Sequence, residues 1–278
     1  MMNIFHEVSQ GCSRLTTERY STSFSGAIKL LHRDLRAPIC NIYGFVRFAD
    51  EIVDTFHDHD KAELLARFKA DTYESIGRGI SLNPILHAFQ LTVNRYSIDP
   101  ELIEAFFRSM EFDLDKRCYD QMGYEEYIYG SAEVVGLMCL YVFCDGDLTH
   151  YEELKPYARS LGAAFQKVNF LRDVKADYQQ LDRVYFPDVD FKKFTPDMKR
   201  RIEEDIAKDF QHAYIGITKL PLKARFGVYL AYKYYLSLFR KIKRMKPHRI
   251  LEERIRIPNW AKAWVAAKAV VRTQLNML

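Results

Sequence analysis

One segment of the chain combines carboxylates with a basic and an aromatic side chain at helical spacing. Tyr43, Arg47, Asp50 and Asp54 follow one another every three or four residues, so on a helix their side chains share one face. Two carboxylates one turn apart repel each other by a few tenths of a kcal/mol, and aspartate is a poor residue for a helix interior. The segment therefore predicts a helix face that needs cations close by.

A second segment repeats this arrangement much later in the chain. Asn169, Asp173 and Asp177 stand four residues apart on a predicted helix. A solvated acidic face would explain one such stripe, but apolar residues flank both stripes. Divalent cations would remove the repulsion, and Mg²⁺ prefers oxygen ligands of this kind. We therefore interpret the two stripes as a Mg²⁺ site shared by two helices.

The ligand that such a site implies is a diphosphate. Mg²⁺ in proteins keeps several waters and is commonly bound by one or two carboxylates together with substrate phosphates. Guanidinium groups suit bidentate recognition of phosphate oxygens. The basic and phenolic side chains that lie close to the stripes in sequence are Arg47, Arg172, Arg183 and Tyr185.

The elements that must position these residues are expected to be helices. With 12 glycines and 9 prolines among 278 residues, the chain has few helix breakers, and 48% of it is hydrophobic. This composition favours a compact all-α fold. No linker rich in Pro, Gly or Ser divides the chain, so we predict a single domain over residues 1–278. Helix-period patterns predict ten helices, at Leu15–Leu31, Ala37–Asp54, Lys61–Arg78, Asn83–Tyr96, Pro100–Asp115, Tyr124–Cys144, Glu152–Asp177, Asp197–Leu220, Leu222–Arg244 and Asn259–Leu275.

The C-terminal segment, residues 238–278, is strongly basic. It contains eleven lysines and arginines but only two acidic residues, a net charge of +9 in a chain whose total is +4. Such a segment suits anionic lipid, nucleic acid or a phosphorylated ligand, or forms a solvated helix face. On the last predicted helix, Trp260 and Trp264 share an apolar stripe. We expect this stripe to pack against the body of the protein, with membrane contact as the alternative.

Other patterns bear on location. The N-terminus shows no pattern typical of a signal peptide. The longest uncharged apolar run, Val134–Cys144, has 11 residues, about half of the roughly 20 that a transmembrane helix needs. We therefore expect a cytoplasmic protein without a transmembrane helix. The five cysteines lie mostly in apolar stretches without a C-x-x-C pair, so we predict that they pack in the core.

Five motifs occur in an order that is informative when they are taken together. They are Ser21–Ser25 (STSFS), Asp50–Asp54 (DEIVD), Tyr127–Gly136 (YIYGSAEVVG), Asn169–Asp177 (NFLRDVKAD) and Asp182–Pro187 (DRVYFP). With them the chain resembles the head-to-head trans-isoprenyl diphosphate synthases, the group of squalene, dehydrosqualene and phytoene synthases. A weaker likeness extends from Arg254 to Lys262.

The resemblance implies a single isoprenoid-synthase helical bundle around a central cavity, with acidic helices at its mouth. Family members couple two allylic diphosphates with the help of Mg²⁺, or of Mn²⁺. Loss of one diphosphate leaves an allylic cation, which alkylates the second substrate to give a cyclopropylcarbinyl diphosphate. This intermediate ionises and rearranges to a linear hydrocarbon. The chemistry requires that the cation be shielded from water while its leaving diphosphate is held by metal and arginine.

The resemblance also assigns roles to the matching positions. It implies metal ligands at Asp50, Asp54, Asn169, Asp173 and Asp177. It implies diphosphate contacts at Arg47, Arg172, Arg183 and Tyr185. It implies substrate contacts at the entrance and along the cavity wall by Ser21, Ser23, Phe24, Tyr43, Tyr129 and Gln166, with Tyr43 and Tyr129 as catalytic candidates. The chain departs from the pattern at Thr22, where many members carry a lysine, so a phosphate-binding lysine is missing there.

The motifs look most like those of bacterial phytoene synthases, which implies two molecules of geranylgeranyl diphosphate as substrates at the entry to carotenoid synthesis. The alternative is a squalene or dehydrosqualene synthase that acts on farnesyl diphosphate, with NADPH needed only for squalene. A head-to-tail synthase is disfavoured because Asp173–Asp177 lacks the second acid of a D-D-x-x-D motif. The remaining alternative is a non-enzymatic helical protein that binds membrane or nucleic acid. We expect prenyl diphosphates and a peripheral membrane contact as partners, and no nucleic acid.

Overall fold

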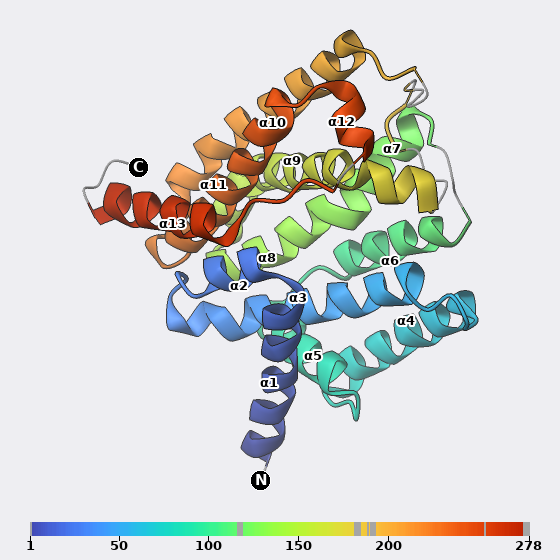
Figure 1. The fold of residues 1–278 in the computed structure, drawn as a ribbon. Coiled ribbons are helices and arrows are strands. Elements are labelled where there is room, and N and C mark those ends of the chain that lie inside the picture. Colours follow the sequence, from blue (N-terminus) through green and yellow to red (C-terminus); the bar gives the residue numbers. More distant parts are fainter. Residues whose placement is uncertain are drawn as a thin grey trace.

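The structure is a computed structural model, and it describes residues 2–115, 119–180, 185–187, 189, 193–252 and 254–274. Within these residues the secondary structure is helical and contains no strand, as the composition predicted. Figure 1 shows helix α8 running through the middle of the molecule, with α3 and α6 on one side of it and α9, α10 and α11 on the other. The prediction of an all-α bundle is therefore confirmed.

The helix bounds agree with the sequence patterns over most of the chain. The helices are α1 Met2–Tyr20, α2 Thr22–Ile28, α3 Arg33–Asp54, α4 Lys61–Arg78, α5 Pro84–Tyr96, α6 Pro100–Asp115, α7 Gln121–Ile128, the π-helical turn η1 Tyr129–Glu133, α8 Val134–Cys144, α9 Leu148–Gln180, α10 Pro196–Lys219, α11 Leu222–Arg244, α12 Pro247–Glu252 and α13 Asn259–Gln274. The predicted helix Leu15–Leu31 was wrong, because Ser21 has extended backbone angles and divides it into α1 and α2.

Several helix starts follow from capping chemistry. The side chain of Ser21 accepts a hydrogen bond from the backbone N–H of Phe24, and Asp60 accepts one from Glu63 in the same way. Asn83 caps α5, whose first residue is a proline. These side chains satisfy N–H groups that have no partner inside the helix, which fixes where each helix begins.

The core between α3, α4, α5 and α6 is aromatic. Phe45 on α3 is fully buried, and its ring stacks on Phe89 with centroids 3.8 Å apart. Phe68, Phe106 and Phe107 surround the same ring at 5.2 to 5.8 Å. Because Phe45 lies on the same helix as Arg47 and Asp50, this cluster anchors the helix that carries the first acidic stripe.

Two glycines allow helices to approach closely around the π-helical turn. A Cβ atom at Gly130 would lie 2.5 Å from the carbonyl oxygen of Ala105 on α6, and one at Gly162 would lie 2.7 Å from that of Ala132. A side chain at either position would therefore have to displace backbone. The absence of a Cβ brings the turn close to α6 and α9.

Helix α7, the π-helical turn and α8 form one continuous stretch, Gln121–Cys144. By length and composition this stretch is sufficient to cross a membrane, and it is the one described helix that passes this test. The apolar helix is thus longer than the 11-residue run indicated, because it begins well before Val134, and the absence of a transmembrane helix stays an expectation. Half of its most apolar window is buried inside the protein, as is typical of a core helix.

The cysteines that the structure describes are free thiols, and Cys118 lies outside the described residues. Cys40 and Cys144 are buried, while Cys12 and Cys139 are partly buried. Burial raises the pKa of the Cys139 thiol to about 12. This thiol is therefore protonated near neutral pH, in agreement with a packing role.

The orientation of α13 differs from the expectation. Trp260 and Trp264 are 74% and 60% exposed, whereas Val265 and Ala269 lie on the inner face of the helix. Helix α13 packs against α11, as Figure 1 shows. The prediction that the tryptophan stripe packs on the body was wrong, because α13 is apolar on two faces and buries the one with the smaller side chains.

One prediction concerns His87, which α1 covers. The Ser81 N–H donates to Nδ1 of His87 at 3.3 Å, so the ring proton is on Nε2, which lies 2.8 Å from Nδ1 of His6. Burial, with a smaller contribution from His6, lowers the pKa of His87. The unfolded chain then binds more protons than the folded one below about pH 6.5. We expect the free energy of unfolding to be unaffected by this group above that pH and to fall as the pH is lowered.

Urea unfolding at pH 7.5 and pH 5.5 measures this dependence. The difference between the free energies of unfolding at the two pH values should shrink in His87→Gln. It should persist in His59→Gln, a change at an exposed position. An unchanged difference in His87→Gln would contradict the assignment.

Candidate active site

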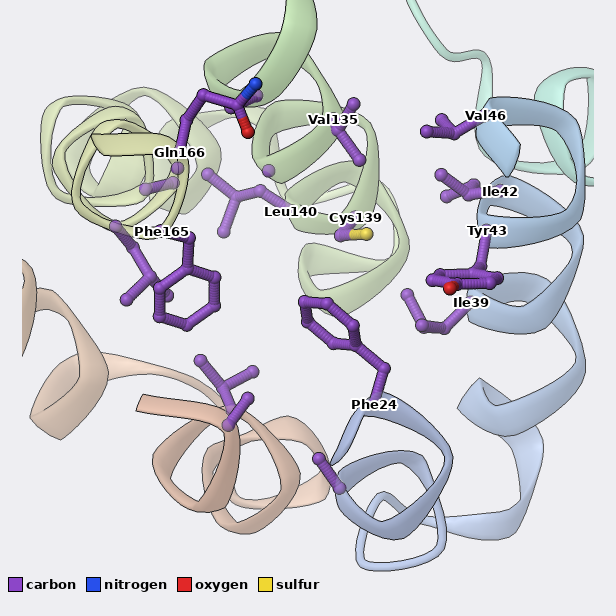
Figure 2. A pocket seen from close by; sticks show the side chains of 18 of the residues that line it. Phe24, Ile39, Ile42, Tyr43, Val46, Val135, Cys139, Leu140, Phe165 and Gln166 are labelled. Carbon is purple, nitrogen blue, oxygen red and sulfur yellow. The ribbon is translucent and has the colours of Figure 1, made fainter. Parts of the chain in front are cut away.

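A cavity of about 380 Å³ lies inside the bundle. Figure 2 shows side chains from several helices pointing into it, among them Phe24 from α2, Tyr43 from α3, Cys139 from α8 and Phe165 from α9. The greater part of its lining is apolar, with further contributions from α10 and α11. A largely apolar space of this kind suits a long hydrocarbon chain.

The lining changes from apolar to polar along two of the helices. On α3 it passes from Ile39 to Arg47 and Asp50, and on α9 it passes from Leu154 to Gln166 and Asn169. Figure 2 shows Gln166 on α9 and Val46, the neighbour of Arg47 on α3, on opposite walls near the top of the view. We call the region of Arg47, Asp50, Gln166 and Asn169 the polar end. The structure therefore brings part of each sequence-predicted stripe to one cavity, Arg47 and Asp50 from the first and Asn169 from the second.

On the α3 side of the polar end, Arg47 organises the acids. Its guanidinium pairs with Asp50 and with Glu51, and lies over the ring of Tyr20 at 4.4 Å from the centroid. The Nε–H of Arg47 is buried and has no acceptor among the described residues. The contacts given for this arginine therefore leave one N–H donor unused.

On the α9 side, Asn169 joins two helices. Its amide nitrogen donates to Gln166 Oε1 at 3.3 Å, and its Oδ1 accepts from the hydroxyl of Tyr235 on α11 at 3.2 Å. The Tyr235 ring stacks on Phe165 with centroids 3.9 Å apart. Asn169 is thus held in one orientation by contacts on both sides.

Asp173 lies one turn beyond Asn169 and binds two arginines. Arg172 contacts it at 2.5 to 3.1 Å, and Arg254 Nε lies 2.8 Å from its Oδ1. The Ile255 N–H also donates to the carbonyl oxygen of Arg172 at 3.4 Å. The segment between α12 and α13 therefore closes over α9 at the second acidic stripe.

Tyr43 and Phe24 form the aromatic part of the wall next to the polar end. Their ring centroids are 5.9 Å apart, and Phe24 also approaches Phe165 and Tyr235 at 6.2 and 5.8 Å. Burial raises the pKa of Tyr43 to about 12, although the charge of Arg47 opposes the rise. Tyr43 is therefore a neutral phenol near neutral pH.

Two residues predicted to contact substrate lie elsewhere. Tyr129 is not part of the cavity lining; the guanidinium of Arg159 covers its ring at 5.2 Å. Tyr185 is buried and stacks on Phe170 with centroids 4.1 Å apart. Both side chains make ring contacts in this structure, and their predicted roles in substrate binding stay predictions. Tyr127, two residues from Tyr129, lines the cavity.

The remaining predicted residues occupy peripheral or undescribed positions. Asp54 ends α3 one turn beyond Asp50, and Ser21 and Ser23 lie at the start of α2, outside the cavity lining. Arg183 and the side chain of Asp177 lie outside the described residues. Their predicted roles stay predictions.

The donor set at the polar end fits a hard divalent cation. Among the described residues, no group of three histidine, cysteine or carboxylate side chains is close enough to hold a metal ion, and the acids pair with arginines instead. The available ligand atoms are carboxylate oxygens and the amide oxygen of Asn169, the chemistry that Mg²⁺ prefers. A bound cation would compete with the arginines for these oxygens.

Sequence reasoning did not assign Tyr235 or Arg254 to the site. Tyr235 lies in a tyrosine-rich part of α11 whose pattern is typical of core residues. Its spacing does not distinguish it from the neighbouring tyrosines. Arg254 lies where the resemblance is weaker. Both reach the site because distant helices pack against α9, which spacing along the chain does not reveal.

Comparisons with known proteins agree with this geometry. The family model described as squalene/phytoene synthase matches residues 17–261. The chain is 27% identical over 210 residues to a 4,4'-diapophytoene synthase of Staphylococcus haemolyticus, covering 75% of this chain and 72% of that protein. It is 28% identical over 281 residues to a phytoene synthase of Rhodobacter capsulatus, covering 93% and 80%.

The fold itself is shared with a solved structure of a dehydrosqualene synthase in complex with ligand. The TM-score is 0.81 at 17% identity, and the match covers 98% of each chain. The chain therefore belongs to the squalene/phytoene synthase family of prenyltransferases, which condense prenyl diphosphates head to head.

Proposed function

We propose that the protein condenses two molecules of geranylgeranyl diphosphate to phytoene through a cyclopropylcarbinyl diphosphate, in carotenoid biosynthesis. The observation that carries the proposal is an apolar cavity whose polar end combines Arg47, Asp50 and Asn169 from two helices. A phytoene synthase among its relatives supports the C40 product. A cavity with one charged end suits a substrate with one charged end and a long hydrocarbon tail.

The family generally uses a divalent metal, and the polar end supplies the ligands that Mg²⁺ would need. Asp50, Asp54, Asn169 and Asp173 are the described residues that would hold it. Bound Mg²⁺ would neutralise the diphosphate and make it a better leaving group.

The protein's own side chains carry the remaining tasks. Arg47 and Arg172 offer guanidinium groups to the diphosphate oxygens, because both lie beside the carboxylates of the site. The apolar lining keeps water from the allylic cation. The ring faces of Phe24, Tyr43 and Phe165 lie along the same wall, where their negative electrostatic potential stabilises positive charge.

The second candidate is a dehydrosqualene or squalene synthase acting on farnesyl diphosphate. The similarity to a 4,4'-diapophytoene synthase favours it. NADPH would be required only if the product were squalene.

Product analysis separates these functions. The purified protein is incubated with Mg²⁺ and either farnesyl or geranylgeranyl diphosphate, with and without NADPH, and the organic extract is analysed by chromatography and mass spectrometry. We expect a C40 triene from geranylgeranyl diphosphate alone. A C30 product would assign the second function instead, and no hydrocarbon from folded protein with either substrate would contradict both.

A matched pair of variants tests the support of Asn169. Tyr235→Phe removes the hydroxyl that donates to Asn169 Oδ1, and we expect turnover at saturating substrate to fall about 3- to 10-fold, the range for one hydrogen bond. Tyr234→Phe is the control, because the Tyr234 hydroxyl makes no hydrogen bond within the described part of the chain. Equal turnover in the two variants would argue against a role for this contact.

We also propose that α13 holds the protein at the cytoplasmic face of a membrane. Trp260 and Trp264 are exposed on the outer face of this helix, and the segment around them carries a net charge of +9. Exposed tryptophans on a basic helix suit the interface of an anionic bilayer. A membrane is also where a C40 hydrocarbon would dissolve.

Sedimentation with vesicles containing phosphatidylglycerol at low salt tests this contact. The wild type should bind, and Trp260→Ser combined with Trp264→Ser should lower binding by at least about tenfold. Leu222→Ser, at an exposed position on α11, should not change it. Absence of wild-type binding would remove the proposal.

A further inference from the structure

Side chains from α7, η1 and α8 line the cavity at a repeat of four residues. They are Tyr127, Ser131, Val135, Cys139 and Phe143. In a regular α-helix each step of four residues exceeds a full turn by about 40°, so four steps would rotate the last side chain by about 160°. The π-helical turn η1 takes more residues per turn and reduces this rotation. It therefore helps to keep the residues before and after it directed at the same cavity.

Arg159 on α9 contacts both ends of this turn. Its Nε–H donates to Oε2 of Glu133, the last residue of η1, at 2.5 Å. Its guanidinium carbon lies 5.2 Å from the ring centroid of Tyr129, the first residue. These three side chains are not part of the cavity lining. Arg159 therefore bridges, from outside the cavity, the segment over which the helix is widened.

The charge of Arg159 is matched to a carboxylate with little access to water. The Glu133 side chain is 13% exposed, whereas that of Arg159 is 49% exposed. Burial raises the pKa of Glu133, and the hydrogen bond and charge of Arg159 oppose the rise. Among the other charged groups that act on Glu133, Asp209 also raises its pKa and Lys167 lowers it. Without Arg159 a largely buried carboxylate would lose its direct partner, and the end of η1 would gain by moving toward solvent.

Helix α9 also packs tightly against the turn. Gly162, one turn after Arg159, lies so close to Ala132 of η1 that a Cβ atom there would come 2.7 Å from the Ala132 carbonyl oxygen. Ala132 and its neighbour Ser131 line the cavity. A shift of η1 would therefore change the cavity wall, because close packing leaves little room to absorb it.

We propose that Arg159 is a positioning residue for the hydrocarbon chain of the substrate. It holds the two ends of η1 and thereby fixes the positions of Tyr127 and Ser131 in the cavity wall. The proposal rests on the proposed function, because it takes a prenyl chain as the occupant of the cavity. It adds to that function a residue that lies outside the cavity lining.

A contribution to stability alone is the competing explanation, and three variants separate the two. Arg159→Met removes the contact with both ends of η1, whereas Arg159→Lys keeps a cation beside them. Arg108→Met is the matched control. Arg108 on α6 is 55% exposed and pairs at 3.7 Å with Glu126 on α7, so it ties the same continuous helix to a neighbour before the turn begins.

The measurement compares two affinities, by titration calorimetry with Mg²⁺ present. One is for geranylgeranyl thiodiphosphate, an unreactive substrate analogue, and the other is for inorganic diphosphate, which has no hydrocarbon chain. We expect Arg159→Met to weaken binding of the analogue about 4- to 16-fold, because burial of each methylene group is worth about fourfold in affinity and one or two should lose contact. Its affinity for inorganic diphosphate should stay within about twofold of the wild type. Arg159→Lys and Arg108→Met should leave both affinities within about twofold.

A double variant tests the route through Glu133. Glu133→Gln combined with Arg159→Met should bind the analogue no more weakly than Arg159→Met alone, because the same contact cannot be lost twice. Losses that multiply would show that the two side chains act independently, which would contradict the proposal.

Three further results would overturn the proposal. They are wild-type affinity for the analogue in Arg159→Met, an equal loss of both affinities in that variant, and a wild type that does not bind the analogue. Hydrocarbon formation is measured separately. A wild type that makes no hydrocarbon from either prenyl diphosphate, while Arg159→Met selectively loses affinity for the analogue, would refute the proposed function and leave the role of Arg159 in place.

Discussion

Replacing Asp50 or Asp173 by asparagine is expected to lower turnover by at least about 10²- to 10³-fold while leaving the helical fold intact. Each change removes one negative charge, from the polar end in Asp50→Asn and from the next turn of α9 in Asp173→Asn, and each preserves the volume of the side chain. The charge matters because arginines pair with these carboxylates here. A divalent cation has to compete with those arginines for the carboxylate oxygens. The carboxylates would act through the cation that they hold, and losing one fixed group that supports charge stabilisation in a transition state has an effect of this size in other enzymes.

The two variants should differ in the ion pairs that remain at the site. In Asp50→Asn, Arg47 keeps its pair with Glu51, so the α3 side retains one acid. In Asp173→Asn, Arg172 and Arg254 lose the carboxylate that they share. We therefore expect Asp173→Asn also to bind inorganic diphosphate more tightly than the wild type when no metal is added.

Product formation at saturating substrate and Mg²⁺ measures the first effect, and circular dichroism at 222 nm checks the fold. Asp58→Asn is the matched control, because Asp58 is exposed in the turn that follows α3. If both variants kept wild-type turnover, the assignment of these acids to a metal site would be wrong.

Phe45→Ala is expected to have the largest effect on stability. The side chain is 0% exposed and contacts the rings of Phe68, Phe89, Phe106 and Phe107. Truncating a buried phenylalanine removes its burial free energy and leaves a cavity, which together cost about 3–5 kcal/mol. Since domains are stable by about 5–15 kcal/mol, a large part of the free energy of unfolding would be lost.

Urea unfolding measures this loss as a lower midpoint at an unchanged slope. Phe48→Ala is the matched control three residues later on α3, where the side chain is 38% exposed, and it should change stability by no more than about 0.5 kcal/mol. A loss below about 1 kcal/mol in Phe45→Ala would show that the cluster repacks without this ring, and that α3 is anchored by other contacts.

The stripe on α3 shows what could be predicted from local spacing. Residues three and four apart share a helix face whatever the rest of the fold does, so the alignment of Arg47 and Asp50 could be predicted from the sequence. The same reasoning placed Asn169 and Asp173 on one face of α9, and the order of the motifs identified the family. That the two stripes share one site was inferred from their common need for a cation and from the family resemblance, and Arg47, Asp50 and Asn169 do line one cavity.

The spacing of apolar residues was misleading where tertiary packing decides which of two similar helix faces is buried. Helix α13 carries apolar residues on both sides, so its pattern did not determine that Val265 and Ala269 would be buried while Trp260 and Trp264 face outward. The motif around Tyr185 likewise did not reveal that its ring stacks on Phe170.

The sequence by itself determined the all-α class, the two acidic stripes and the family, because helix propensity, side-chain periodicity and motif order are properties of short segments. The tertiary structure alone decided that Tyr235 supports Asn169, that Arg254 binds Asp173 and that Lys262 reaches Thr22. These contacts join residues far apart in the chain. Their geometry depends on how every helix packs against the shared core, and that packing free energy is spread over too many residues for any local pattern to encode it.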